Sequence, residues 1–162
     1  MLRTWDTAIK NGLFAYYHRE EYAYFYGAKG GLLTDAYMDY LIKTYPNHFI
    51  KYTPEELKRI KDYSRGKIGY DCSGFTGWIC TGDTQNSAGQ FANCNHVSTD
   101  LVAGVAGSLL YRPGHIGIDI GYGYFLHMPN EGRTIELGKI LEYPWEKTGR
   151  CNLLDYNGSD KR

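Results

Sequence analysis

Several features that mark particular classes of protein are missing from this chain of 162 residues. Its sequence contains no apolar run near the roughly 18 residues that a membrane-spanning helix needs. It also has no excess of either charge, because 18 Lys and Arg residues balance 18 Asp and Glu residues. That balance argues against a nucleic-acid partner, since affinity for nucleic acid rests on neutralising phosphates. It leaves a peptide or glycan partner open.

The start of the chain, Met-Leu-Arg-Thr-Trp-Asp, lacks the apolar stretch and the small-residue cleavage site of a secretory signal. We therefore expect synthesis in a cytoplasm without a signal peptide.

The four cysteines are irregularly spaced and form no C-x-x-C pair, which is the usual beginning of a zinc site. They are Cys72, Cys80, Cys94 and Cys151. We expect free thiols, of which at most one is chemically special, with no bound metal and no cofactor.

The order of the predicted elements indicates an α+β fold, with residues 1–162 forming a single domain. A chain of this length buries roughly 70% of the surface that it exposes when unfolded, so its core needs no disulfides. Helices are expected first and an antiparallel sheet last. The expected helices cover 3–18, 33–45, 53–63 and 72–80, and the expected strands cover 108–112, 115–120, 124–128, 133–137 and 150–155.

Two local signals refine these boundaries. Thr53, followed by Pro-Glu-Glu, is typical of a helix start with a capping box. Residues 81–97 are rich in Gly, Asn, Ser and Thr and are expected to form a loop, after which Ser98 or Thr99 caps a short helix.

Cys72 differs from the other cysteines in its surroundings. It is expected in the first turn of a helix, where unpaired backbone N–H groups and the helix dipole favour the nucleophilic thiolate. Asp71 is placed to cap that helix, and the small side chain of Ser73 leaves room for a substrate. A lone cysteine is more often a buried apolar residue, and Cys80 and Cys151, set among apolar residues, fit that interpretation.

His115 and His127 are expected on one face of a β-hairpin. With a Gly-Tyr-Gly loop, Ile120 faces Tyr124, Gly117 faces His127, and His115 lies two residues along on the same face. Such diagonal neighbours lie about 7–8 Å apart. One ring then takes the proton from a thiol and the other orients it. Two half-buried structural histidines are the alternative.

These residues resemble the motifs of the NlpC/P60 family of cysteine peptidases. Residues 71–75, Asp-Cys-Ser-Gly-Phe, are similar to its nucleophile motif, and residues 114–121 resemble its H-[VI]-G-[IV]-x-[IL]-G strand. The step of twelve residues from His115 to His127 matches the third catalytic position, which is His, Asn or Gln in the family. The resemblance covers 68–155 and implies a papain-like fold in which the nucleophile helix packs on a small antiparallel sheet.

The resemblance implies further site residues. Tyr24, in the segment Tyr-Phe-Tyr-Gly, is similar to a family tyrosine that contributes to the oxyanion and substrate site. Its distance along the chain from Cys72 is far longer than usual in the family, so a helical insertion is expected at 32–65. Asp71 and Ser73 are expected to contact a substrate amine.

The activity that the resemblance implies is a peptidoglycan endopeptidase, which cleaves stem peptides of the bacterial cell wall. Cys72 is the expected nucleophile, His115 its base and His127 the orienting residue. A phage or prophage endolysin, acting at the cell wall, is the expected role. There are two alternatives. One is an N-acetylmuramoyl-L-alanine amidase or an acyltransferase with the same thiol site, and the other is an inactive cell-wall-binding module. The bond that is cut, the target organism and the oligomeric state are left open.

Overall fold

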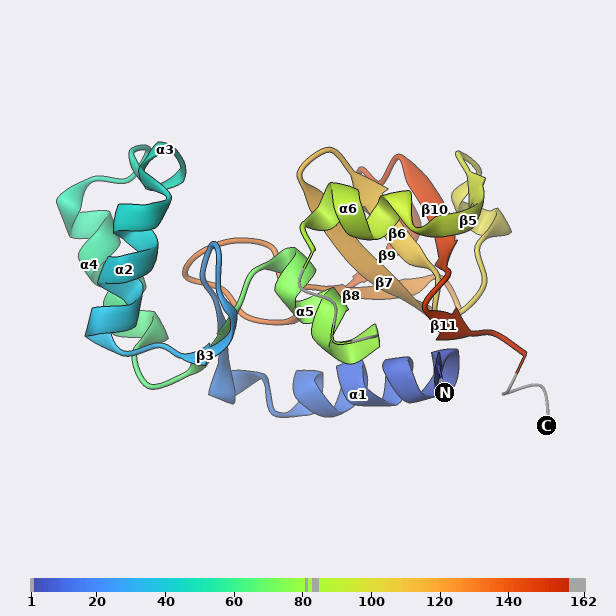
Figure 1. The fold of residues 1–162 in the computed structure, drawn as a ribbon, viewed down its shortest axis with the longest axis horizontal. Coiled ribbons are helices and arrows are strands. Elements are labelled where there is room, and N and C mark those ends of the chain that lie inside the picture. The colour runs from blue at the N-terminus through green and yellow to red at the C-terminus, as the bar shows by residue number, and fades with distance from the viewer. Residues whose placement is uncertain (1, 81, 83–84, 158–162) are drawn as a thin grey trace.

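The computed structural model describes residues 2–80, 82 and 85–157 and confirms the α+β fold class. Helix α1 (Trp5–Tyr17) lies along one side of the molecule, and the largest sheet lies opposite (Figure 1). Helix α5 (Cys72–Cys80) lies between them. No helix of the described residues is long and apolar enough to cross a membrane.

The largest sheet has six strands in the order β5-β10-β6-β7-β8-β9, and each neighbouring pair is antiparallel. Its strands are β5 (Cys94–Ser98), β6 (Leu109–Arg112), β7 (His115–Gly121), β8 (Tyr124–His127), β9 (Glu136–Lys139) and β10 (Lys147–Cys151). The central strands are rich in Leu, Ile and Phe. This composition favours a pleated sheet that buries at least one face.

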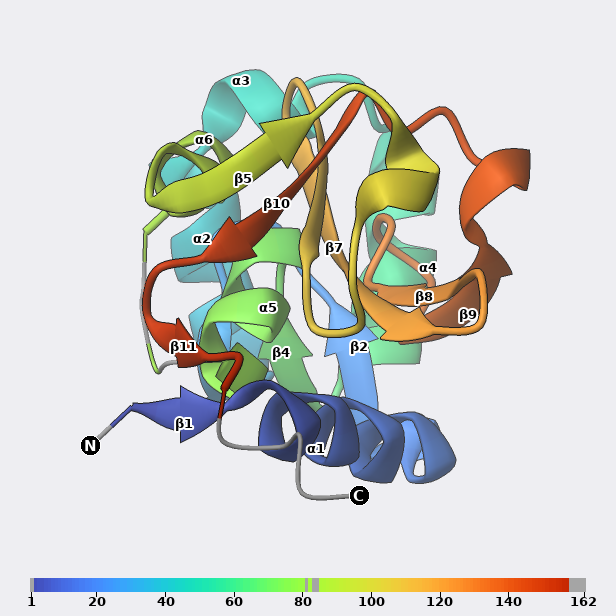
Figure 2. The same ribbon diagram turned by 90° about the vertical axis from the view of Figure 1, so that its right-hand side faces the viewer.

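Two smaller sheets complete the strand topology. Strand β4 (Ile68–Tyr70) lies between β2 (Tyr22–Tyr24), which runs parallel to it, and β3 (Lys29–Leu32), which runs antiparallel. Near the chain ends β1 (Arg3–Thr4) pairs in parallel with β11 (Leu154–Asp155), as Figure 2 shows. The pairing of β2 with β4 connects the N-terminal segment to the residues directly before Cys72.

Helix α5 is the central element of the core. Its residues are apolar or small on every side, which is the pattern of a helix that is covered all round. Eight of its nine residues are buried. It packs against α1 and against β7, so its apolar surface holds the two layers together. The position of the first residue of α5, Cys72, is therefore fixed by the packing of the whole core.

Three further helices form a group at the left in Figure 1, around a small second core that they share with residues 23–33. They are α2 (Asp35–Thr44), α3 (Pro46–Phe49) and α4 (Pro54–Ser64), and they occupy the segment 32–65 that was expected to be helical. We call them the helical unit. The capping box at Thr53 is confirmed: its hydroxyl accepts the N–H of Glu56, and the Glu56 carboxylate accepts the N–H of Thr53.

A buried carboxylate joins the helical unit to the loop after β8. Both oxygens of Glu131 are used, since Oε1 lies 2.6 Å from His48 Nε2 and Oε2 accepts the Tyr52 hydroxyl at 2.7 Å. The His48 ring also stacks on Tyr26, with ring centroids 3.8 Å apart. This contact places the helical unit beside the segment that follows β2.

The expectation of a loop over 81–97 is wrong. Helix α6 (Ser87–Ala92) and strand β5 lie within it, while residues 81, 83 and 84 are outside the described part of the chain. The Asn86 side chain caps α6 by accepting the N–H of Gly89. Strand β5 forms because it pairs with β10, a partner that local composition does not reveal.

Other boundaries also differ from the expectation. The strand expected at 133–137 begins at Glu136, and the one expected at 150–155 is divided between β10 and β11. Neither Ser98 nor Thr99 caps a helix; Asp100 caps a single 3-10 turn, Leu101–Ala103. Strands β3 and β4 were not expected at all, because both are short and rich in glycine or tyrosine.

The Glu131 contact gives a prediction about stability. Replacing Glu131 with Ala removes the acceptor for two partly buried groups, and we expect the free energy of unfolding to fall by about 1–3 kcal/mol. Urea unfolding followed by circular dichroism measures the change. Glu136→Ala is the matched control, because its ion pair with Arg133 is largely exposed and should contribute under about 1 kcal/mol. Equal losses in the two variants would contradict the prediction.

Candidate active site

The end of β4 and the start of α5 place Cys72 at the edge of the core. Asp71 caps the helix, because its Oδ1 accepts the N–H of Gly74 at 2.7 Å. The predicted cap is therefore confirmed. Cys72 is only 7% exposed, yet it lines an open groove. Cys72, Cys80 and Cys94 are free thiols, and Cys80 and Cys151 are buried as expected.

The β7–β8 hairpin brings His115 and His127 into direct contact. Ile118 pairs with Leu126, so Gly117 lies opposite His127 as the sequence predicted. The register shifts only near the turn, where Gly121 rather than Ile120 lies opposite Tyr124. Across the diagonal, His115 Nε2 lies 2.8 Å from His127 Nδ1.

Aromatic side chains hold the His115 ring in place. The Trp145 indole stacks on it with ring centroids 5.2 Å apart and planes 5° apart. Tyr143 packs against His115 and His127. Gly117 leaves space for Trp145, because a Cβ there would lie 2.9 Å from the indole. Sequence reasoning missed Trp145 and Tyr143, which follow β9 in an irregular segment without a motif.

The pKa values of the thiol and of both imidazoles favour their uncharged forms at neutral pH. Burial raises the pKa of Cys72 to about 11, although backbone hydrogen bonds from Ile116 and Ser73 act in the opposite direction. Burial lowers the pKa of His115 to about 4 and that of His127 to about 3. The position of Cys72 at the start of α5 therefore does not by itself give a thiolate, because burial has the larger effect on the pKa of the thiol.

Tyr24 lies beside Cys72 despite their separation in sequence. Strand β2 runs parallel to β4 with Tyr24 opposite Tyr70, two residues before Cys72. The Tyr24 side chain lines the same groove and is 6% exposed. Burial, followed by the proximity of Cys72, raises the pKa of the Tyr24 hydroxyl, which therefore stays protonated and able to donate.

Lys29 donates hydrogen bonds to Asp71 and Ser73, the other two expected site residues. Its Nζ lies 2.7 Å from Asp71 Oδ1 and 2.8 Å from Ser73 Oγ. Lys29 comes from β3 and was not recognised in the sequence, because no motif marks it.

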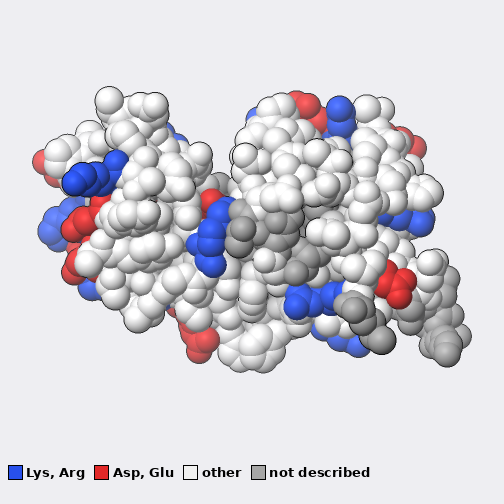
Figure 3. All heavy atoms as spheres, viewed as in Figure 1, with Lys and Arg blue, Asp and Glu red and all other residues white. Residues whose placement is uncertain are grey.

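The groove has a volume of about 510 Å³. It lies between the helical unit and α6, where the surface is hollowed in Figure 3. Its walls come from β2 and the residues after it, the α2–α3 link, the start of α5, α6 and the β6–β7 turn. Its lining residues are Tyr24, Tyr26, Gly27, Lys29, Tyr45, Asp71, Cys72, Ser73, Asn86, Ser87, Ala88 and Gly114.

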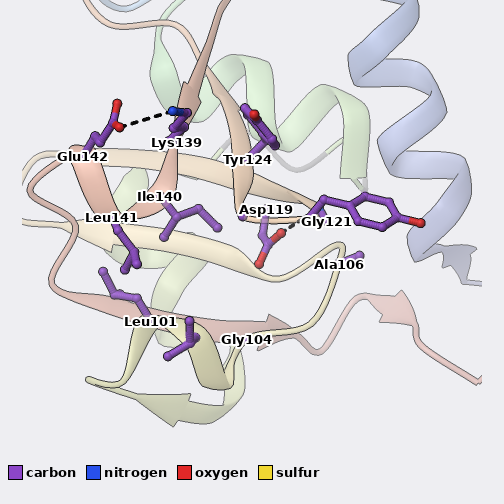
Figure 4. A pocket seen from close by; sticks show the side chains of 13 residues that line it. Leu101, Gly104, Ala106, Asp119, Gly121, Tyr124, Lys139, Ile140, Leu141 and Glu142 are labelled. Atoms are coloured by element: carbon purple, nitrogen blue, oxygen red, sulfur yellow. Dashed lines mark hydrogen bonds and ion pairs between the residues drawn. The ribbon is translucent and has the colours of Figure 1, made fainter.

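A second cavity, of about 530 Å³, lies at the far end of β7 (Figure 4). Asp119 lines it, and burial raises the pKa of that carboxyl to about 6. Its Oδ1 accepts the N–H of Gly121 at 2.7 Å. Most of the remaining lining is apolar, and none of Cys72, His115 and His127 lines this cavity. Among the described residues no group of three His, Cys, Asp or Glu side chains is arranged to hold a metal.

Solved structures share this arrangement of elements. The peptidoglycan hydrolase RipB from Mycobacterium tuberculosis superposes with a TM-score of 0.54 over 94% of this chain and 67% of its own, at 16% identity. NlpC1 from Trichomonas vaginalis superposes with a TM-score of 0.53 over 89% of this chain, at 14% identity. NlpC2 from the same organism gives 0.52 over 89%, at 12% identity.

The chain has an NlpC/P60-like fold. No family model matches its sequence, and no curated protein does. The chain spans less than half of the length of the two Trichomonas proteins, at 44% and 46%. At these identities the likeness concerns the NlpC/P60-like fold, and the chemistry has to be argued from this chain's own residues.

The raised thiol pKa predicts how Cys72 reacts with an alkylating reagent. Only the thiolate reacts, so the rate in the native protein should still be rising above pH 9, because the pKa lies near 11. Iodoacetamide labelling at a series of pH values, with peptide mass analysis of the Cys72 peptide, measures this. The same peptide in denaturant is the control and should follow an ordinary thiol with a pKa of about 8.5. A native plateau below pH 8 would show that the pKa is not raised.

Proposed function

We propose that this chain is a cysteine peptidase that hydrolyses stem peptides of bacterial peptidoglycan, with Cys72 as nucleophile, His115 as base and His127 as orienting residue. One observation carries the proposal. The His115–His127 hydrogen bond lies at the start of β7, the strand against which α5, the helix that begins at Cys72, is packed.

The hydrogen bond assigns a separate task to each imidazole nitrogen. In the proposed tautomer His115 Nε2–H donates a hydrogen bond to His127 Nδ1, 2.8 Å away, and the unprotonated His115 Nδ1 accepts the proton of the thiol. When His115 becomes positively charged, the same bond to His127 stabilises it. The stacked Trp145 keeps the ring in this plane.

Because Cys72 and His115 both start uncharged, the thiol proton moves to His115 as the sulfur attacks the amide carbon. The backbone N–H of Cys72 and the protonated Tyr24 hydroxyl are the proposed donors to the oxyanion. His115 then gives its proton to the leaving amine, and a thioester forms. Water, deprotonated by His115, attacks the thioester and releases the acid and the free thiol.

The shape of the groove supports a peptide substrate. Its volume is about 510 Å³, and tyrosine side chains from β2 and from the α2–α3 link line it together with the thiol. Such side chains offer both an apolar face and a hydroxyl. The helical unit is proposed to be an insertion in a single catalytic domain, since its Tyr45 forms part of the groove wall. A phage-type endolysin acting at the cell wall is the biological role that we propose for this activity.

Digestion of purified sacculi tests the reaction. We expect new free amines from cleaved stem peptides, identified by mass analysis, and a loss of at least about a thousandfold in Cys72→Ala. Cys94→Ala is the control, because that thiol is outside the groove. Release of intact stem peptides would instead indicate an amidase, and sedimentation with the wall without cleavage would indicate a binding module. Full activity of Cys72→Ala would remove the proposed nucleophile.

Two substitutions test the role of His127. Asn retains a group that can accept a hydrogen bond from His115, whereas Ala does not, so we expect kcat/KM to fall by about tenfold in His127→Asn and about a hundredfold or more in His127→Ala. The release of soluble peptide from sacculi gives the rates, and thermal unfolding checks that both variants are folded. Equal activities in the two variants would exclude His127 from the triad.

A further inference from the structure

An ion pair lies in the groove one residue away from Cys72. Asp71 is 7% exposed, and its carboxylate accepts four hydrogen bonds. Three reach Oδ1, from Lys29 Nζ, from Gly74 N at 2.7 Å and from Ser73 Oγ at 3.2 Å. The fourth reaches Oδ2, from Gly27 N at 3.1 Å. Both oxygens of this carboxylate therefore already accept hydrogen bonds from the protein's own donors.

The structure around Asp71 is built to hold Lys29. Strand β3 pairs with β4 so that Lys29 lies opposite Tyr70, directly before Asp71. The aliphatic stem of Lys29 passes close to Gly74, where an added Cβ would lie 3.2 Å from Lys29 Cδ and 2.7 Å from the Ala28 carbonyl oxygen. A larger residue at position 74 would therefore displace the lysine stem.

The charge in the groove is balanced before any substrate arrives. Lys29 and Asp71 are the charged side chains among its described lining residues, and they pair with each other at 2.7 Å. A substrate ammonium at this place would add a positive charge beside Lys29 and meet a carboxylate whose charge Lys29 already balances. A neutral acyl group would leave the charge balanced.

Lys29 also retains a hydrogen that a substrate can use. An ammonium group has three N–H donors, and within the described residues Nζ donates to Asp71 Oδ1 and Ser73 Oγ. Its side chain is 29% exposed and lines the groove. The third donor is therefore available to a carbonyl oxygen of the substrate.

From this geometry we infer that Lys29 is a specificity-determining residue, which makes the groove select peptides whose amino group is acylated over peptides with a free amino terminus at that position. The inference rests on the proposed peptidase function. It changes the role expected of Asp71 and Ser73: they hold Lys29, and Lys29 contacts the substrate.

A pair of matched peptides tests the inference. One is a stem tetrapeptide with a free amino terminus and the other is the same peptide with an N-acetyl group. At pH 6.5 we expect the wild-type protein to give a kcat/KM at least tenfold higher for the acetylated peptide. The preference should shrink as the pH rises past the pKa of an α-amino group, about 7.7–8.0, because the amine then loses its charge. A preference for the free amine, or a ratio that does not change with pH, would overturn the inference.

Lys29→Met provides the second arm, because methionine is of similar length but carries no charge. We expect this variant to reduce the ratio at least tenfold, mainly by raising kcat/KM for the free amine. Lys58→Met, on the exposed face of α4, is the control for loss of a positive charge and should leave the ratio unchanged. Circular dichroism and thermal unfolding establish that Lys29→Met is folded. An unchanged ratio in folded Lys29→Met would overturn the inference.

Calorimetric titration of both peptides into Cys72→Ala separates this inference from the proposed function. Tighter binding of the acetylated peptide without any cleavage by the wild-type protein would retain the role of Lys29 and refute the peptidase. Cleavage of both peptides at equal rates with equal binding would retain the peptidase and refute the role of Lys29. Binding of neither peptide would refute the role of Lys29.

Discussion

The burial of helix α5 is the constraint on which the rest of the structure depends. This helix fills the space between α1 and the six-stranded sheet, and it is covered on nearly all sides. Because protein interiors are close-packed, a helix in this position cannot shift by itself. Its first residue, Cys72, is consequently held at one place relative to the start of β7, where His115 lies. The precision of the candidate site therefore comes from the packing of the core.

The same burial sets the electrostatics of the site. It raises the pKa of the Cys72 thiol to about 11 and lowers those of the two histidines, so every member of the proposed triad is uncharged at neutral pH. A neutral triad avoids the cost of holding separated charges in a poorly solvated place. In the proposed reaction the charge appears only as the thiol attacks, and the hydrogen bond between His115 and His127 is proposed to stabilise it.

The groove is built from parts of the chain that lie far apart in the sequence. Tyr24 comes from β2, Tyr45 from the helical unit, Asn86 from the turn before α6, and Gly114 from the β6–β7 turn. The contact of Glu131 with His48 and Tyr52 holds the helical unit against the loop after β8. The shape of the groove thus depends on the packing of two small cores, and its charge depends on Lys29 and Asp71.

The sequence by itself determined the α+β order, the helix that begins at Cys72 with its Asp71 cap, and the face shared by His115 and His127. These features follow from local rules, namely capping chemistry, hydrophobic periodicity and the alternation of side chains along a strand. Only the tertiary structure decided that Tyr24 lies beside Cys72, that Trp145 stacks on His115 and that Lys29 binds Asp71 and Ser73. It also decided that burial has a larger effect on the pKa of the Cys72 thiol than the helix start has. Each of these depends on pairing or packing between segments far apart in the chain, for which local sequence carries no signal.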